Sequence, residues 1–299
     1  MPITARPTAI STLGWQQSQA AMASQLQNEP HSNRIGILFE QAFSCYLSHE
    51  PLALTRAICR FDQIQSRIQV QSKTTGKTIG EFDFLFIDTL EKRPVHAELA
   101  VKFFLLKRPA MSNPEVMANW IGPNQRDRLD LKYEKLFIQQ LQLATTPEGR
   151  QKVEQLSFEA ARIQQQYHVK GVLFYPIEKA GTEINQLRST LPNTINPQCS
   201  LGFWLEMDQA PAFFAGKAHW RWRLLRRREW IYQWETASLA TGAAADYSPQ
   251  TLSTGALEQA LHQQLLQFKT PVQIVGFAKE DGYEAQRYFV APTGWSETT

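Results

Sequence analysis

Charged residues stand inside two short apolar segments, and their types and spacing could support chemistry. Residues 80–86 hold Asp83 among aromatic and aliphatic side chains, and residues 96–102 hold Glu98 and Lys102. Alternate side chains of a strand share one face, so Glu98 and Lys102 point to the same side, and a neighbouring strand can bring Asp83 beside them. Charges among so many apolar side chains are costly unless they have partners, which favours a functional cluster.

A pair of carboxylates on a rigid sheet suits a hard divalent cation, because Mg²⁺ (or Mn²⁺) prefers oxygen ligands and keeps several waters. Such a cation orients a phosphate oxygen, and a nearby lysine stabilises transition-state charge or helps to activate water. The pattern therefore predicts a metal site at Asp83 and Glu98, with Lys102 assisting. The alternative is a half-solvated antiparallel sheet with cross-strand ion pairs only. His96 is predicted to be structural, because no second histidine stands at metal-ligand spacing.

Basic residues gather at the start of a helix that the sequence predicts from Asn124 onward. Asn124 is a typical N-cap residue, and apolar side chains recur after it at helical spacing. A helix N-terminus beside arginines is suited to phosphate, so Arg126, Arg128 and Lys132 are candidate contacts with a nucleic-acid backbone. An ordinary capped amphipathic helix explains the same residues equally well.

Tryptophan and arginine alternate in residues 220–223, and three more arginines follow at 226–228. In a strand this alternation places both tryptophans on one face and Arg221 and Arg223 on the other. Basic groups beside aromatic rings suit a nucleic-acid backbone and unstacked bases, so Arg221 and Arg223 are further candidate contacts with DNA or RNA. Tryptophans in the core and solvated arginines are the simpler interpretation.

The elements that must position these residues follow from hydrophobic periodicity and turn signals. The order is a helix, a meander of three strands, further helices and a buried strand, followed by a less regular part. This order predicts an α/β protein with a mixed, α+β type of sheet. The predicted helices are 34–47, 124–141, 151–167 and 256–268, with a short one at 15–26, and the predicted strands are 67–71, 79–87, 95–106, 170–175, 201–205 and 220–223, with a final hairpin of 272–278 and 284–290.

Composition limits the class of protein further. The chain has 299 residues and a net charge of +3, which is too small to indicate a nucleic-acid protein unless the charges are clustered. No apolar run approaches the roughly 20 residues of a membrane helix, and the N-terminus lacks a secretory pattern, so we expect a cytoplasmic protein without a membrane partner. Cys45, Cys59 and Cys199 match neither a disulfide framework nor a zinc site. The sequence carries no signal for an oligomeric state.

The order of elements and the acidic strands resemble the PD-(D/E)XK nuclease superfamily over residues 34–176. The resemblance implies a restriction-endonuclease-like core in which Asp83 and Glu98 are the metal ligands. It also implies that Lys102 is the catalytic lysine and that Glu40, on the first helix, supplements the acidic site.

The spacing of Lys102 departs from the superfamily pattern. There the lysine stands two residues after the acid, about 7 Å along a strand, whereas Lys102 stands four residues after Glu98, about 13 Å away, with Ala100 at the expected position. A bulge or the long lysine side chain would close this gap. In a straight strand the lysine would contact phosphate instead of the metal-bound water, and the fold could be a binding module without cleavage.

Four segments are closer to a bacterial family known as domain of unknown function 1853. They are EFDFLF around Asp83, ELAVKFFL from Glu98, residues 120–130 and residues 221–225. This second resemblance adds a family without an activity.

From the acidic residues and the superfamily resemblance we expect a metal-dependent nuclease that acts on DNA or RNA, or alternatively a catalytically inactive module of that fold that binds nucleic acid or a protein partner. The expected parts are a polar extension (1–30), the nuclease-like core (31–178) and a C-terminal elaboration (179–299) with a linker at 236–248.

Overall fold

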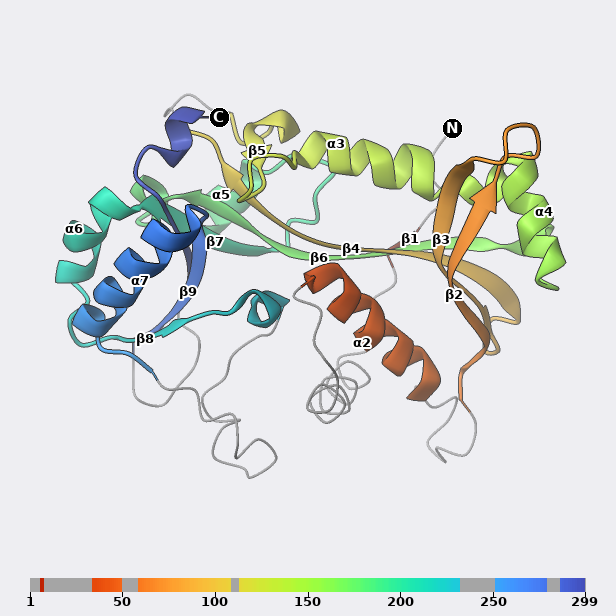
Figure 1. The fold of residues 1–299 in the computed structure, drawn as a ribbon, viewed down its shortest axis with the longest axis horizontal. Coiled ribbons are helices and arrows are strands. Elements are labelled where there is room, and N and C mark those ends of the chain that lie inside the picture. Colours follow the sequence, from red (N-terminus) through yellow and green to blue (C-terminus); the bar gives the residue numbers. More distant parts are fainter. Residues whose placement is uncertain are drawn as a thin grey trace. The chain divides into compact units, whose positions relative to one another are not determined.

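The computed structural model describes residues 6–7, 34–49, 59–108, 113–231, 251–278 and 286–298, which form a mixed α/β fold (Figure 1). The α/β prediction is therefore confirmed. The chain forms two compact units. Unit 1 comprises Met1–Val101 and Lys132–Lys170, and unit 2 comprises Lys102–Leu131 and Gly171–Thr299. The predicted linker at 236–248 and the predicted helix at 15–26 lie outside the described residues, and the predicted domain boundaries stay a prediction.

Unit 1 is built on an antiparallel meander, as the sequence predicts. Its strands are β2 (Phe61–Gln71), β3 (Thr78–Asp88) and β4 (Arg93–Leu106), and β2 begins six residues before the predicted start. The strand order continues from β4 to β6 (Gln164–Pro176), and the short β1 (Arg6–Pro7) runs parallel to β6. Both β4 and β6 also contribute residues to unit 2.

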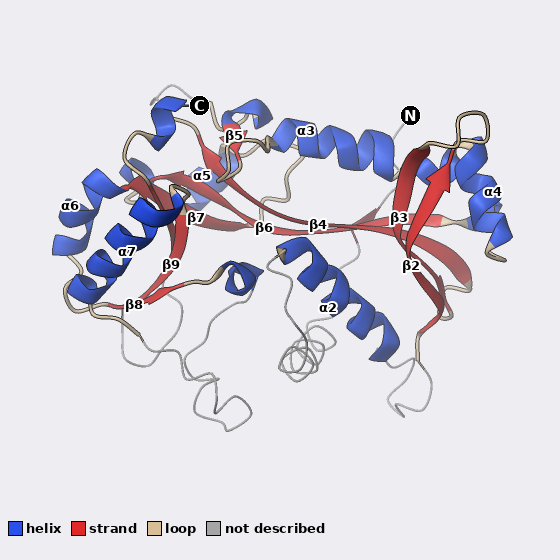
Figure 2. Ribbon diagram, viewed as in Figure 1, coloured by secondary structure: helices blue, strands red, loops and turns tan. Residues whose placement is uncertain are grey.

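Helices cover both faces of this meander (Figure 2). The apolar stripe of α2 (Ile35–His49) packs on Phe84 and Phe86 of β3, and the Phe43 and Phe84 rings meet edge to face at 5.1 Å. Val153 of α4 (Pro147–Gln155) belongs to the cluster on the opposite face, with Leu85. Phe84 and Phe86 therefore face α2, whereas Leu85 and Ile87 face the other side, which explains why residues 84–87 are all apolar.

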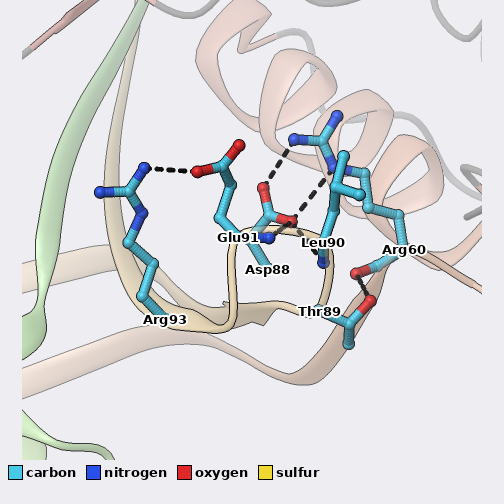
Figure 3. Close-up of polar contacts among 6 residues, drawn as sticks. All are labelled: Arg60, Asp88, Thr89, Leu90, Glu91 and Arg93. Carbon is cyan, nitrogen blue, oxygen red and sulfur yellow. Dashed lines mark hydrogen bonds and ion pairs between the residues drawn. The ribbon is translucent and has the colours of Figure 1, made fainter.

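The turn between β3 and β4 is closed by Asp88, which is buried (Figure 3). Its carboxylate accepts hydrogen bonds from Arg60 Nε and Nη2, at 3.2 and 2.7 Å, and from the N–H groups of Leu90 and Glu91, at 3.1 and 3.2 Å. Thr89 Oγ1 also donates to the Arg60 carbonyl at 2.7 Å. These bonds pin the turn to the start of β2 and so fix the register of β3 against β4.

The helix predicted from Asn124 begins later than expected. The α-helix α3 spans only Leu129–Glu134 and continues as a π-helical segment, Lys135–Gln140. Asn124 Oδ1 instead accepts hydrogen bonds from the N–H groups of Arg126 and Asp127 at 3.1 and 3.4 Å. Asparagine stabilises turns in this way as readily as it caps helices, so the N-cap prediction was wrong.

The helix predicted at 151–167 is also wrong in its bounds. Helix α4 starts at Pro147, where Thr146 Oγ1 accepts from the Gly149 N–H at 3.0 Å, and it ends at Gln155. Ser157 then adopts a positive φ of 65°, which breaks the helix, and residues from Gln164 join β6. Sheet pairing outweighs the weak helical propensity of this polar segment. The predicted strand 170–175 is confirmed as part of β6.

Unit 2 combines parallel and antiparallel pairing. Its strand order is β4, β6, β7 (Ser200–Glu206), β10 (Gln286–Ala291), β9 (Val272–Phe277) and β8 (Arg221–Leu224), and β5 (Trp120–Ile121) pairs with β4. The neighbours β6, β7 and β10 are parallel, whereas β10, β9 and β8 are antiparallel. These strands confirm the predictions for the C-terminal third of the chain. The helices are α5 (Ile184–Ser189), α6 (Ala210–Ala215) and α7 (Thr254–Phe268), and the last two share a core with Trp222 and Tyr288.

Of the helices that the structure describes, none combines the length and apolar character needed to cross a lipid bilayer.

Replacing the buried Asp88 by alanine is expected to destabilise the protein by about 1–3 kcal/mol, because the partly exposed Arg60 and two turn N–H groups lose their acceptor. The midpoint of urea unfolding measures the loss. Glu91→Ala is the matched control, since the Arg93–Glu91 pair at 2.7 Å is exposed and such pairs contribute little. Equal midpoints for both variants would contradict the anchoring role of Asp88.

Candidate active site at the fork of two strands

The candidate site lies where the β3–β4 ladder stops. The last paired residues are Phe84 and Ala97. One residue further along each strand, carboxylate oxygens accept the backbone hydrogen bonds instead of carbonyls. The Asp83 N–H donates to Glu98 Oε1 at 3.4 Å, and the Leu99 N–H donates to Asp83 Oδ2 at 2.8 Å. The two acids therefore face each other across a fork in the sheet, as the sequence predicts for neighbouring strands.

Glu98 is held from two further sides. His96 Nε2 lies 2.8 Å from Glu98 Oε1, and Gln140 Nε2 donates to Glu98 Oε2 at 2.7 Å. The side chains of His96 and Glu98 are both 0% exposed. Lys132 Nζ donates in turn to Gln140 Oε1 at 3.4 Å, so a chain of hydrogen bonds runs from an ammonium group to the buried carboxylate.

The π-helical segment is what allows Lys132 and Gln140 to act together. In an α-helix, 100° per residue would leave side chains eight residues apart pointing about 80° away from each other. The hydrogen bond from the Leu141 N–H to the Leu136 carbonyl, at 2.9 Å, is of the wider i→i+5 type. A π turn rotates less per residue, so both side chains come to one face, and such segments are frequent at functional sites.

Burial controls the protonation of the acids. It raises the pKa of Asp83 to about 7, with a further rise from the Glu98 charge and an opposing effect of the Leu99 N–H. Burial also raises the pKa of Glu98 to about 7, and the Asp83 N–H and the Lys132 charge oppose this rise. Because the charge of Glu98 also raises the pKa of Asp83, the two carboxyl groups are coupled and change protonation near neutral pH.

His96 is neutral in this arrangement. Burial lowers the pKa of His96 to about 3, so its imidazole is uncharged at neutral pH, with Nε2 at hydrogen-bond distance from Glu98. Its Nδ1 is buried and has no hydrogen-bond partner among the described residues. His96 packs edge to face on Phe82, with ring centroids 4.7 Å apart.

Glu40 and Lys102 have different surroundings. Glu40 forms an ion pair with Arg67 at 2.6 Å, and its charge is a smaller contribution to the raised pKa of Asp83. Lys102 Nζ pairs with Asp127 Oδ2 at 2.6 Å within unit 2. The cation whose charge acts on both acids is Lys132, which the sequence suggested only as a phosphate contact.

The remaining candidate contacts differ in exposure and in their partners. Arg126 and Arg128 are both exposed, and Arg128 forms a two-pronged ion pair with Asp130 at 2.9 and 2.7 Å. In β8, Arg221 is exposed, but Arg223 is buried and pairs with Glu229 at 2.6 Å. The predicted separation of tryptophans and solvated arginines is therefore wrong for Arg223, because Glu229 neutralises its charge inside the fold.

Sequence reasoning missed two members of the site. Gln140 carried no signal, because its alignment with Lys132 depends on the π turn. His96 stands two residues before Glu98, and the two-residue period of a strand could have identified it as a neighbour of that carboxylate.

A cation could be held here by Asp83 and Glu98. Three of their four oxygens already accept hydrogen bonds, Asp83 Oδ2 from Leu99 and both Glu98 oxygens. Asp83 Oδ1 is thus the oxygen that a cation could take without displacing a hydrogen bond among the described residues. In the described part of the chain, no group of three or more His, Cys, Asp or Glu side chains is arranged to hold a metal ion. Mg²⁺ needs only one or two carboxylates beside its waters and a substrate phosphate.

Comparison with known proteins gave one family. The model of a domain of unknown function (DUF1853) matches residues 4–291, nearly the whole chain. No curated protein and no solved structure matches significantly.

The carboxyl pair should make stability depend on pH. The pKa values of both acids are raised in the folded state, so the folded protein binds more protons than the unfolded chain between about pH 4 and pH 7. The free energy of unfolding therefore falls as pH rises through this range. Asp83→Asn removes much of this loss. We therefore measure the melting temperature of the variant minus that of wild type at two pH values. This difference should be several degrees more positive at pH 8 than at pH 5. Glu115→Gln, at an exposed acid, should show no such trend, and a constant difference for Asp83→Asn would contradict the pairing.

Proposed function

The chain belongs to the family described as domain of unknown function DUF1853. We propose that it is a metal-dependent nuclease that hydrolyses phosphodiester bonds of DNA or RNA. The observation that carries the proposal is the carboxyl pair Asp83 and Glu98, raised in pKa to about 7 beside the charge of Lys132. Strongly perturbed acids with a specific charged partner are characteristic of functional sites.

The residues fit a divalent cation in their donor chemistry. The pair offers hard oxygen donors, and a bound cation would relieve the repulsion between the half-buried Asp83 and the buried Glu98 carboxylates. When bound, Mg²⁺ or Mn²⁺ would lower the pKa of a water and neutralise charge on a phosphate. Asp83 and Glu98 would hold it.

The protein's own groups prepare this site. His96 and Gln140 orient Glu98 through one hydrogen bond to each of its oxygens, as outer partners of metal ligands do. Lys132 supplies a fixed positive charge that favours the ionised acids and that would attract a phosphate. Glu40, restrained by Arg67, adds negative charge near Asp83.

The order of elements in unit 1 supports a restriction-endonuclease-like core. Helix α2 is followed by the meander β2 to β4, then α3 with its π segment, and then β6. We assign the lysine of the superfamily pattern to Lys132, because Lys102 is engaged with Asp127.

A second candidate is a non-catalytic module of the same fold that binds nucleic acid or a protein partner. It is favoured by the complete burial of Glu98 and by the protein donors on both of its oxygens. In this case the acids would be a structural network, and no cation would be bound.

Calorimetric titration with MgCl₂ and with MnCl₂ separates the two. For a nuclease we expect saturable binding to wild type, no binding to Asp83→Asn, and wild-type binding to the exposed control Glu115→Gln. Cleavage of labelled single-stranded and duplex DNA and RNA should follow the same pattern. Negligible heat and no cleavage with the wild-type protein would reject the nuclease and leave the binding module.

The two lysines can be compared directly. Lys132→Met should lower the cleavage rate by about 10²–10³-fold, the usual cost of removing one preorganised charge at the reacting centre. Lys102→Met should change it only severalfold, because that ammonium is paired with Asp127. Melting temperatures check that both variants fold. The reverse ranking would return the catalytic role to Lys102.

A further inference from the structure

A short stretch of unit 2 is far more basic than the chain as a whole. Residues 213–231 contain six Lys and Arg residues and one acidic residue, a net charge of +5, whereas the complete chain has +3. The rest of the sequence is therefore slightly acidic. Affinity for phosphates depends on such clustering and not on the total charge.

The structure exposes most of this charge on one local unit, strand β8 and the 3₁₀ turn Arg227–Ile231 that follows it. Arg221, Arg226 and Arg227 are exposed, and Arg228 is partly exposed. Among the strands that the structure describes, β8 is at the end of the sheet order, next to β9 only.

A buried ion pair holds the arginine turn in place. Glu229 Oε1 pairs with Arg223 Nη2 at 2.6 Å, and Glu229 Oε2 accepts from the Arg226 N–H at 2.7 Å. The Glu229 N–H also donates to the Arg226 carbonyl at 2.8 Å. Arg223 therefore anchors the turn from inside, and this anchor presents the side chains of Arg226 and Arg227 outward.

The aromatic side chains of this segment lie on the other face of β8, with the core that includes Trp222. Trp220 is half-buried and stacks on Trp222, with ring centroids 5.4 Å apart and planes inclined by 25°. Lys217 Nζ lies 4.1 Å from the centroid of Phe213 and 5.6 Å from that of Trp220. Gly276 leaves room for the stack, since a Cβ there would lie 2.6–2.8 Å from both tryptophan rings.

We propose that Arg221, Arg226 and Arg227, the basic-turn surface, bind the phosphate backbone of a nucleic acid. The choice of nucleic acid rests on the proposed function, but these residues belong to unit 2, whereas the carboxyl pair belongs to unit 1. Guanidinium groups match phosphate oxygens in a two-pronged geometry. Among the described residues, no large exposed apolar side chain falls between 213 and 230, which argues against insertion into an anionic membrane.

The test is binding of a short labelled oligonucleotide, single-stranded or duplex, by fluorescence anisotropy in EDTA at about 50–200 mM KCl. EDTA prevents metal-dependent cleavage, so only binding is measured. Arg226→Ala/Arg227→Ala should weaken binding about tenfold and reduce the slope of log affinity against log salt by about 0.7–0.9 for each lost contact.

Two matched variants control for folding and for total charge. Arg226→Lys/Arg227→Lys keeps the charge and should keep most of the affinity. Lys73→Ala/Lys77→Ala removes two exposed charges from the β2–β3 turn of unit 1 and should leave the affinity unchanged. Unchanged binding by the Arg226→Ala/Arg227→Ala variant, or an equal loss in the lysine control, would overturn the proposal. If the Arg226→Ala/Arg227→Ala variant lost binding to phosphatidylserine vesicles but kept oligonucleotide binding, the surface would be a membrane contact and the proposal would be overturned.

The outcome is separable from that of the proposed function. Asp83→Asn should bind the oligonucleotide in EDTA as tightly as wild type. If the basic-turn variant loses binding while wild type neither binds a cation nor cleaves, the surface stands and the nuclease fails. If wild type cleaves in an Asp83-dependent way while the basic-turn variant binds normally, the nuclease stands and the surface fails.

Discussion

The point at which strands β3 and β4 stop pairing governs the candidate site. Beyond Phe84 and Ala97, each strand offers a carboxylate to an N–H of the other, so Asp83 and Glu98 replace the missing ladder bonds. A fork in a sheet exposes backbone groups that need partners, and two acids satisfy them while they meet each other. The same arrangement that completes the backbone bonding brings two negative charges together, and burial then raises their pKa values.

Partners for buried charge recur elsewhere in the molecule, and each pair also fixes a loop. Asp88 joins Arg60 to the β3–β4 turn, and Glu229 joins Arg223 to the turn that carries the exposed arginines. Removing one partner of such a pair is costly, because the other charge is left buried. These pairs therefore determine geometry more than they contribute net stability, and the acid register and the basic turn both depend on them.

The carboxyl pair differs from these compensated pairs. The side chains that hold Glu98 are the neutral His96 and Gln140, and the charge of Lys132 favours the ionised form of both acids. Neutral donors orient a carboxylate without lowering its pKa as far as a direct ion pair would. The pair consequently stays poised near neutral pH at a cost in stability, a common condition of sites that are selected for function and not for folding.

Patterns in the sequence were sufficient to predict the α/β class, the meander, and the meeting of Asp83 with Glu98, because a period of two and strong apolar patterning hold in most environments. They were not sufficient for the start of α3, the end of α4 or the burial of Arg223, since turns and sheet pairing overrode local propensity there. The cation whose charge acts on the acids became clear only from the fold. A π turn, which leaves no pattern in sequence, aligns Lys132 with Gln140, and an ion pair to Asp127 engages Lys102.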